Sequence, residues 1–400
     1  MKKIRIACIA THPIQYHVPL YKRLALERDV CFTVLYRSRH GLVESFDPQF
    51  GIKIKWDTNL TDGYKFKFLP AWGRADKLSF WRPFTRGLFK ELIKGRYDIV
   101  WIQGYGRFQH VAVIPFLRIL GCRVLLRDDP HYGSRPRNRY GDLKSKALFW
   151  MLRNFVSGFL CVGSANRDYF LARGVPRHKT IIMPYAVDNG HFSVRNYDEK
   201  LQFKAKLLRE LGLSKERKIF LYVGKFIELK NCDVLLKAFS KAKDELGSLI
   251  CPILLMVGAG IMEAELRSLT NALELNDAVY FLGFKNQNEL PDIYKGSDIF
   301  VLPSKYETWG LSINEAMAAG CSVITTSNVG ASFDLVETGK NGYVCDSNNV
   351  LELANCMVRS CKDEQTIKLH SDESRAIIRN WTYDHDVLVM RAEVDRLISR

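Results

Sequence analysis

The sequence lacks any apolar run long enough to cross a bilayer. Its charge-free central stretch, residues 248–262, contains a proline and two glycines, which argues against a membrane-spanning helix there. The apolar N-terminal segment is too short for a signal peptide, because Arg5 interrupts it and His12 and Pro13 follow directly. We therefore expect a soluble or peripheral protein in which residues 4–10 form a first strand.

Disulfide and metal-binding patterns are missing as well. The ten cysteines include no CxxC pair and lie mostly in apolar, strand-like segments. This excludes a disulfide framework or a zinc site of the usual spacing and indicates buried thiols in a reducing cytosol. Low-complexity segments and short repeats are also missing, so we expect a globular chain of two or three domains.

Acidic residues are scarce in the first half of the chain. Residues 1–186 contain 33 Lys and Arg against 13 Asp and Glu, whereas the remaining residues contain 26 against 30. The net charge of +16 therefore comes entirely from the first half. Such an imbalance indicates an anionic partner, which could be a membrane surface, a phosphorylated substrate or nucleic acid.

Short apolar strands alternate with helical patterns along the whole chain. Strand-like segments lie at 4–10, 30–36, 98–105, 123–127, 158–163 and 180–188, and again at 218–224, 252–258, 278–284, 298–303, 322–326 and 341–346. This alternation predicts an α/β protein with two doubly wound, Rossmann-like domains. The predicted bounds are 1–187 for the first domain, 188–216 for a linker, 217–375 for the second domain and 376–400 for a C-terminal helix.

Polar residues follow several of these strands, at the edge of a parallel sheet where ligands bind. The candidates in the first half are His12, Gln15, His17, Gln103, Arg127 and Asp128, and those in the second half are Lys225, Gly258 and Glu307. Their presence in both halves predicts an active-site cleft between the two domains.

The loop after residues 218–224 suits a diphosphate. It carries Lys225 and Lys230 directly after Gly224, without acidic metal ligands nearby, so the lysines can act as fixed cations. Solvent-facing loop lysines are the alternative for this stretch alone. Gly310 precedes a predicted helix at 311–319, whose free N–H groups and positive dipole end could receive the same phosphates.

Two glutamates frame the start of that helix, and with the lysine loop they carry a family resemblance. The segment resembles the retaining glycosyltransferases of family 4, whose E-x7-E signature matches Glu307 and Glu315. The family's strand-G-R-x4-K loop matches Gly224, Lys225 and Lys230, and its glycine strand ends match 258–260 and 282–283. The similarity is close over residues 218–346. Residues 12–25, HPIQYHVPLYKRLA, resemble the opening of a bacterial subset that acts in surface-polysaccharide assembly.

The resemblance implies the GT-B architecture, in which two Rossmann-like domains face each other across a cleft and a C-terminal helix crosses back to the first domain. It implies a hexosyltransferase-type enzyme (EC 2.4) that needs neither a metal nor a cofactor. The donor would be a sugar on UDP or GDP, transferred with retention of configuration. The acceptor would be a hydroxyl of a polysaccharide or an undecaprenyl-type lipid-linked oligosaccharide in lipopolysaccharide or capsule synthesis.

The resemblance also assigns roles at the donor site. Glu315 would accept hydrogen bonds from ribose hydroxyls, and Glu307 would hold hydroxyls of the donor sugar near the anomeric carbon. Lys225 and Lys230 would stabilise the leaving diphosphate, whose oxygen takes the acceptor proton, so no separate general base is needed. The implied donor-binding residues are Gly224, Lys225, Lys230, Gly258, Gly283, Phe284, Glu307, Gly310, Leu311 and Glu315, of which Glu307, Lys225 and Lys230 would be catalytic.

Several positions depart from the family pattern. Lys225 replaces the usual arginine, which keeps the charge but loses the bidentate fork. The usual glycine-rich loop after the first strand is THPIQYHVP, and Arg127 stands where a histidine is common. The acceptor-binding candidates are His12, Gln15, His17, Gln103, Arg127 and Asp128, although His12 and His17 could equally cap a turn. The adjacent Asp128 and Asp129 point apart in a strand, which argues against a metal site.

Aromatic and basic residues are interleaved at 77–94 and 144–155, which suits an anionic membrane surface as well as helices packed on a sheet. With a membrane-borne acceptor, the protein would be cytoplasmic and peripheral on the inner face of the cytoplasmic membrane.

Two other classes of function remain open. One is another enzyme of the same architecture, such as a sugar-nucleotide epimerase or a glycan phosphorylase. The other is a basic nucleic-acid-binding protein, for which the sequence has no recognisable module.

Overall fold

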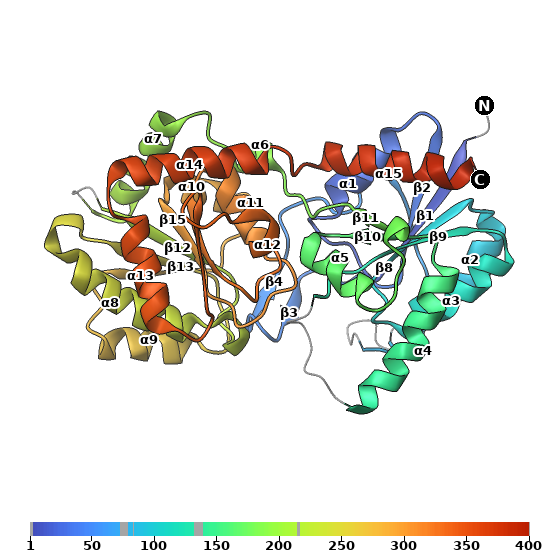
Figure 1. Ribbon diagram of the computed structural model, residues 1–400, viewed down its shortest axis with the longest axis horizontal. Helices are drawn as coiled ribbons and strands as arrows, with labels where there is room; N and C mark the ends of the chain where they lie inside the picture. The colour runs from blue at the N-terminus through green and yellow to red at the C-terminus, as the bar shows by residue number, and fades with distance from the viewer. Residues whose placement is uncertain (1–2, 73–78, 83, 132–138, 214–216, 400) are drawn as a thin grey trace. The chain divides into compact units, whose positions relative to one another are not determined.

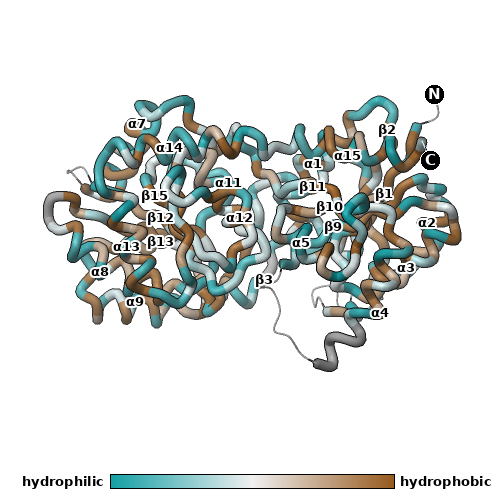
Figure 2. The backbone as a smooth tube through the Cα atoms, viewed as in Figure 1, coloured by the Kyte–Doolittle hydropathy of each residue, from teal (hydrophilic) through white to brown (hydrophobic). Residues whose placement is uncertain are grey.

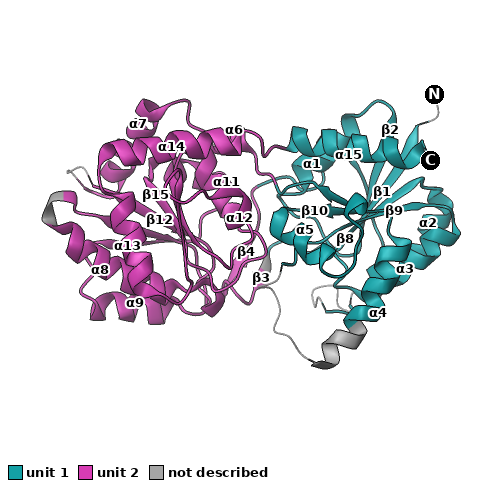
Figure 3. Cartoon of the chain, in the orientation of Figure 1, with its two compact units in different colours: residues 1–45, 58–185, 383–400 teal, residues 46–57, 186–382 magenta. Residues whose placement is uncertain are grey.

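The computed structural model describes residues 3–72, 79–82, 84–131, 139–213 and 217–399. The chain forms two compact units (Figure 3). Unit 1 contains residues 1–45, 58–185 and 383–400, and unit 2 contains residues 46–57 and 186–382. Each unit is built around a parallel sheet with helices on both faces (Figure 1), so the predicted fold class of two doubly wound domains is confirmed.

The sheet of unit 1 has seven strands in the order β11-β10-β9-β8-β1-β2-β5, and its strand pairs are parallel. The strands are β1 (Ile4–Ala10), β2 (Val30–Tyr36), β5 (Lys65–Phe68), β8 (Ile99–Gln103), β9 (Arg123–Arg127), β10 (Gly158–Cys161) and β11 (Thr180–Ile182). All six strands expected in this half are present, and β5 adds an edge strand that the sequence pattern did not predict. A small separate sheet pairs β6 (Ala71–Trp72) with β7 (Phe84–Thr85).

Helices cover both faces of this sheet. α1 (Val18–Leu26) and α15 (Tyr383–Ile398) lie on one face, and α2 (Leu88–Gly95), α3 (Phe108–Ile119), α4 (Arg139–Phe155) and α5 (Ser164–Leu171) lie on the other (Figure 1). The short 3-10 turn η2 (Arg177–Lys179) precedes β11. The strands are continuous apolar runs because both faces are buried, as Val100, Ile102 and Phe159 show with no exposed surface.

The C-terminal helix belongs to unit 1, which confirms its expected return to the first domain. The Arg391 guanidinium of α15 donates to both carboxylate oxygens of Asp29 at 2.6 and 2.9 Å and to Glu27 at 2.6 Å. Arg23 of α1 donates to Asp384 at 2.8 Å. The returning helix begins at Tyr383 and not at residue 376, because residues 376–378 end the preceding helix α14.

The sheet of unit 2 has six parallel strands in the order β14-β13-β12-β15-β16-β17. They are β12 (Ile219–Val223), β13 (Ile253–Val257), β14 (Val279–Gly283), β15 (Ile299–Leu302), β16 (Ser322–Thr326) and β17 (Gly342–Cys345), all of them expected from the sequence.

One face of this sheet is covered by α8 (Cys232–Ile250), α9 (Glu263–Ala272) and α13 (Val350–Ser360). The other is covered by α7 (Tyr197–Glu210), α10 (Leu290–Gly296), α11 (Leu311–Ala318) and α14 (Glu364–Ile378). Hydrophilic and hydrophobic residues alternate along these covering helices (Figure 2). The short elements are α6 (Asn189–Phe192), α12 (Ser332–Leu335) and η3 (Glu228–Lys230).

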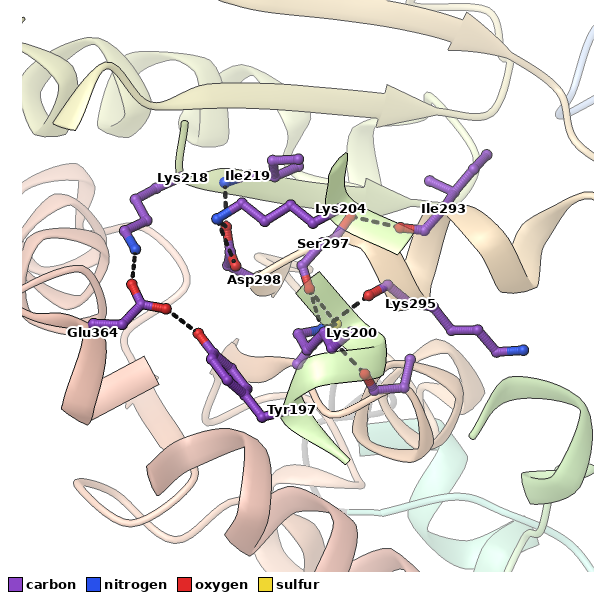
Figure 4. A network of polar contacts seen from close by, with 12 residues as sticks. Tyr197, Lys200, Lys204, Lys218, Ile219, Ile293, Lys295, Ser297, Asp298 and Glu364 are labelled. Carbon is purple, nitrogen blue, oxygen red and sulfur yellow. Dashed lines mark hydrogen bonds and ion pairs between the residues drawn. The ribbon is translucent and has the colours of Figure 1, made fainter. Parts of the chain in front are cut away.

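The described part of the predicted linker 188–216 is helical and packs within unit 2. Its helix α7 buries two lysines that meet the next strands (Figure 4). Lys204 forms an ion pair with Asp298 at 2.9 Å, and the same carboxylate accepts the backbone N–H of Ile219 at 2.8 Å. Lys200 donates to the carbonyls of Ser297 and Ala319. This polar segment therefore forms a helix whose buried lysines are hydrogen-bonded within unit 2.

Residues 46–57 form a hairpin of β3 (Ser45–Asp47) and β4 (Ile52–Ile54) that belongs to unit 2, although it interrupts the sequence of unit 1. The residue ranges of the two observed units thus differ from the predicted domain limits, and those limits stay a prediction.

None of the ten cysteines forms a disulfide. No helix in the described ranges combines the length and apolar character needed to cross a membrane.

Candidate functional site

The loop that follows β12 carries the two candidate phosphate lysines. Gly224 continues from the strand, and the Tyr222 hydroxyl donates to the Lys225 carbonyl at 2.8 Å, which holds the loop in place. Lys230 ends the 3-10 turn η3, and Asn231 adopts a left-handed conformation (φ 60°) before α8 starts. Both lysines therefore leave a short, hydrogen-bonded loop and not a flexible one.

Two glycines after β13 allow the backbone of this loop to lie against the backbone of the segment that follows β13. A Cβ atom at Gly258 would lie 1.9 Å from the Gly224 carbonyl oxygen, and one at Gly260 would lie 2.3 Å from that of Phe226. No side chain can be accommodated at such distances from backbone atoms. The glycine pattern 258–260 is thus explained by the approach of two backbone segments.

The E-x7-E segment lies between β15 and the first turns of α11. Gly310 precedes the helix with φ 100°, in the region that favours glycine. Glu307 is fixed by its backbone, because its N–H donates to Asn328 at 3.2 Å and its carbonyl accepts from Gly330 at 3.1 Å. Its carboxylate forms an ion pair with Lys230, and the two side chains are 22% and 19% exposed. The structure therefore brings these two predicted catalytic residues together.

Glu315 lies inside α11 and is only 1% exposed. It accepts a hydrogen bond from the Tyr294 hydroxyl of α10 at 2.8 Å. The sequence did not predict this tyrosine partner, which fixes the carboxylate in the protein interior. The expected contact of Glu315 with a ribose stays a prediction.

The end of β14 completes this edge of the sheet. Gly283 has φ 69°, and its carbonyl accepts the N–H of Gly258 at 2.9 Å, so the ends of β13 and β14 lie side by side. The Phe284 ring that follows is 5.4 Å from Phe50 and 6.2 Å from Trp56. Loops from β12, β13, β14 and β15 thus gather the predicted donor-binding residues at one edge of unit 2.

Lys225 has partners that sequence reasoning missed. Its ammonium lies 3.1 Å from the Asp47 carboxylate, 2.7 Å from the Gln49 side-chain oxygen and 4.6 Å from the centre of the Phe50 ring. Partial burial opposes ionisation of Asp47, but the N–H groups of Phe50 and Gln49 together with Lys225 lower the pKa of that carboxyl. No motif in residues 46–57 signals this contact.

In unit 1, the candidate acceptor residues lie at the carboxyl ends of β1, β8 and β9, which are neighbours in the sheet. His12, Gln15 and His17 occupy the loop between β1 and α1. Burial lowers the pKa of His12 to about 4 and that of His17 to about 3, so both imidazoles are neutral at pH 7. Within the described residues, His12 Nδ1 and Gln15 Oε1 are buried without a hydrogen-bond partner. Such atoms are rare in proteins and are compatible with a polar ligand.

Three further candidates are already engaged within unit 1. Gln103 donates to the Tyr21 hydroxyl at 3.3 Å, and Asp128 accepts the N–H of Tyr105 at 3.1 Å. Arg127 is 2% exposed and donates to two carbonyls that follow β11, those of Met183 at 3.0 Å and Pro184 at 2.8 Å. The sequence placed these residues at the correct edge, but it did not reveal that Arg127 is held by carbonyl groups.

A metal site is not apparent in the parts of the chain that the structure describes, where no group of three or more His, Cys, Asp or Glu could hold an ion. The expected independence from metals stays a prediction.

Comparison with known proteins adds sequence relatives. Residues 203–380 match the family model described as Glycosyl transferases group 1. A UDP-Gal:alpha-D-GlcNAc-diphosphoundecaprenol alpha-1,3-galactosyltransferase of Escherichia coli is 29% identical over 328 residues, which cover 80% of this chain and 81% of that protein. An N-acetyl-alpha-D-glucosaminyl L-malate synthase of Bacillus anthracis is 30% identical over 44% of this chain and 46% of that protein. The similarity spans less than half the length of the first three curated relatives.

A solved structure shares the fold. The chain is similar to Anabaena Alr3699/HepE in complex with UDP, with a TM-score of 0.76 and 16% identity, covering 98% of this chain and 100% of that one. At this identity the likeness concerns the fold alone, which is the GT-B architecture.

Proposed function

The chain belongs to the group 1 glycosyltransferases through its residues 203–380, and from that premise we propose that it transfers a sugar from a nucleotide diphosphate to an acceptor hydroxyl. The observation that carries this proposal is the cluster at one edge of unit 2. Lys225, Lys230 and the start of α11 supply positive charge there, and Glu307 supplies a carboxylate beside it. This arrangement suits a diphosphate that leaves from a sugar.

The chemistry follows from where charge develops. As the bond between the anomeric carbon and the phosphate oxygen breaks, negative charge accumulates on the diphosphate and positive charge on the sugar ring. Lys225, Lys230 and the N–H groups at Gly310 and Leu311 stabilise the former, and such preorganised groups are usually the largest catalytic contribution. Glu307 orients hydroxyls of the donor sugar. The acceptor hydroxyl attacks from the face that the phosphate leaves, and the phosphate oxygen takes its proton, so the product retains the donor configuration.

The proposed acceptor is supported by residues of unit 1 and by the name of one relative. The name of the E. coli relative contains an acceptor sugar on diphosphoundecaprenol, and the similarity to it spans 80% of this chain. We therefore assign a glycan or lipid-linked acceptor in cell-surface glycan synthesis, with UDP or GDP as the donor nucleotide. His12, Gln15 and His17 are the candidate contacts, because two of them have buried polar atoms without a partner in the described structure.

A membrane-borne acceptor would hold the protein at the inner face of the cytoplasmic membrane. Unit 1 carries exposed aromatic side chains next to basic residues, among them Phe80, Trp81, Phe84 and Phe89. Aromatic insertion combined with basic charge is the pattern by which peripheral proteins bind anionic lipid. Residues 77, 78 and 83 of the segment 77–94, which suggested this surface, lie outside the described residues.

The proposal is tested by thermal-shift and calorimetric titration with UDP, GDP and their sugar conjugates, followed by product analysis. We expect one nucleotide to raise the melting temperature, because a ligand that binds only the folded state stabilises it. With the matching sugar conjugate and acceptor, NMR should show retained anomeric configuration, and activity should persist in EDTA. Binding of neither nucleotide overturns the proposal, and an inverted product or complete loss of activity in EDTA overturns the mechanism.

A further inference from the structure

The β3–β4 hairpin, residues 46–57, is docked on unit 2 by its own contacts. Its second strand is followed by Lys55, whose carbonyl accepts from the Asn286 side chain at 2.8 Å, and by Asp57, whose carboxylate accepts the N–H of Asn288 at 3.0 Å. Trp56 packs 6.2 Å from the Phe284 ring. These contacts fix the base of the hairpin to the loop after β14, next to the predicted donor-binding residues.

Side chains in the turn of the hairpin contact the Lys225 ammonium. Asp47 and Gln49 place two oxygen atoms within 3.1 Å of the ammonium, and the Phe50 ring lies against it at 4.6 Å. The turn itself aims the carboxylate, because the N–H groups of Gln49 and Phe50 donate to Asp47 at 2.8 and 3.1 Å. The pair is partly buried, with Lys225 25% and Asp47 29% exposed, so its attraction is only partly screened by water.

Both lysines of the phosphate loop are therefore paired with carboxylates, but the two pairs differ. Lys230 meets Glu307, which stands on a neighbouring loop of the same sheet edge and is a proposed contact of the donor sugar. Lys225 meets Asp47, which comes from a distant part of the sequence and matches no motif of the donor site. A diphosphate that approaches Lys225 would face the like charge of Asp47, so carboxylate and phosphate cannot both hold this ammonium well.

We propose that Asp47 competes with the donor diphosphate for Lys225, so that the β3–β4 hairpin sets the affinity of the donor site. The hairpin turn must release Lys225 when the nucleotide binds and can rebind it when the diphosphate leaves. This inference rests on the proposed function, because it takes the loop at Lys225 to be the diphosphate site. It makes Asp47 and Gln49 determinants of donor affinity that lie outside the family motifs.

Calorimetric titration of the full-length protein with UDP, or with GDP if the wild type binds that instead, tests the competition. Asp47→Asn keeps the size of the side chain and removes its charge. We expect the dissociation constant to fall about two- to fivefold, the range for a partly exposed ion pair. Gln49→Glu adds a second carboxylate at Lys225 and should weaken binding by a similar factor. Asp57→Asn is the matched control, because it removes a charge from the same hairpin but keeps an acceptor oxygen for Asn288, and it should leave the constant unchanged.

A double-mutant cycle shows whether the effect passes through Lys225. In a Lys225→Met background, Asp47→Asn should no longer tighten binding, because no ammonium remains to compete for. The same gain in that background, or unchanged or weaker binding of Asp47→Asn alone, overturns the inference while leaving the proposed function intact. If the wild type binds neither nucleotide, the proposed function itself fails, so the two failures are distinguishable.

Discussion

Replacing Lys230 by alanine tests whether its ion pair with Glu307 marks a diphosphate site. Both side chains are about one fifth exposed, so the ammonium is partly shielded from water. A unit charge about 4 Å from a phosphate oxygen gains about 4 kcal/mol at an effective dielectric constant near 20. Part of this attraction already acts on Glu307 in the free enzyme, so only the surplus that develops in the transition state is lost.

The expected loss is therefore that of one preorganised charge-stabilising group. Removing such a group raises the barrier by about 2.7–4 kcal/mol, which is about a 10²- to 10³-fold decrease in kcat/KM. The assay is the initial rate of nucleoside diphosphate release with the nucleotide sugar that stabilises the wild type. Melting temperatures measured in parallel separate a catalytic loss from a folding defect.

The chain offers a matched control in Lys305, which forms an ion pair with Glu228 at 3.0 Å on the surface of the same unit. Those side chains are 37% and 83% exposed, and surface pairs contribute about 0–1 kcal/mol. We expect Lys305→Ala to change kcat/KM by less than about twofold, because this pair is screened and lies on no proposed substrate contact. If Lys230→Ala melts like the wild type and keeps its kcat/KM, the lysine does not face the leaving group, and the alternative of a solvated loop lysine holds.

Three other perturbations have expected outcomes. Burial, aided by Arg37, lowers the pKa of His110 to about 3, so this imidazole stays neutral in the folded state while the unfolded state takes up a proton below about pH 6.5. This difference in protonation should lower the free energy of unfolding by about 2 kcal/mol as the pH falls from 7 to 5. In denaturant titrations, His110→Asn should lack this contribution. An identical pH dependence of stability in the wild type and the variant contradicts this. Gly258→Ala should lower the free energy of unfolding by about 1–3 kcal/mol or more, because its Cβ would lie 1.9 Å from the Gly224 oxygen. Gly106→Ala, with no atom within 4 Å of the added carbon, should be near neutral, and equal melting temperatures for the two variants refute the packing argument. In vesicle co-sedimentation, the protein should bind anionic lipid and be partly released as salt shortens screening to about 10 Å at 0.1 M, whereas equal binding to neutral lipid, or none to either, contradicts a charged docking surface.

The strands could be predicted because burial on both faces leaves a direct trace in the sequence. All twelve expected segments contain a strand of one of the two sheets, each trimmed by at most a few residues except 180–188, where β11 ends at Ile182. The edge strand β5 was missed because KFKF alternates charged and apolar residues and has only one neighbour in the sheet. A strand that is half solvated carries too short a pattern to stand out from a loop.

The helix α7, which lies in the segment predicted as a linker, was not predicted for a related reason. Lys200 and Lys204 are read as solvent-facing in any local window, yet they are 1% and 3% exposed. Their acceptors are the carbonyl of Ser297 and the carboxylate of Asp298, which lie far along the sequence. Buried charges need such partners, and only the folded chain shows that the partners exist.

The predicted donor site likewise combines residues that local patterns predict with contacts that only the folded chain shows. The lysine loop, the E-x7-E segment and the glycines could be predicted because each is a local pattern at a strand end. The Asp47 contact with Lys225 and the Tyr294 contact with Glu315 could not, since each joins two segments by tertiary packing alone. Local patterns thus predicted which residues gather at the edge of unit 2, but not which protein groups already occupy them.

Asp386 of α15 gives a final prediction that mirrors the one for His110. It faces Arg127 at 4.0 Å and is 1% exposed, and burial raises its pKa to about 7 although Arg127 opposes the shift. As the pH rises from 5 to 7, the unfolded state has already lost this proton while the folded state retains it, so stability should fall by about 2 kcal/mol. His110, His12 and His17 change stability in the opposite direction over the same range, because burial lowers the pKa of each imidazole, so Asp386 offsets part of their combined pH dependence. Asp386→Asn removes one side of this balance, and its stability, measured by denaturant titration, should therefore rise by about 2 kcal/mol from pH 5 to pH 7 relative to the wild type. A variant whose pH profile runs parallel to that of the wild type would show that the carboxyl ionises normally beside Arg127 and that the ion pair holds the C-terminal helix at both pH values.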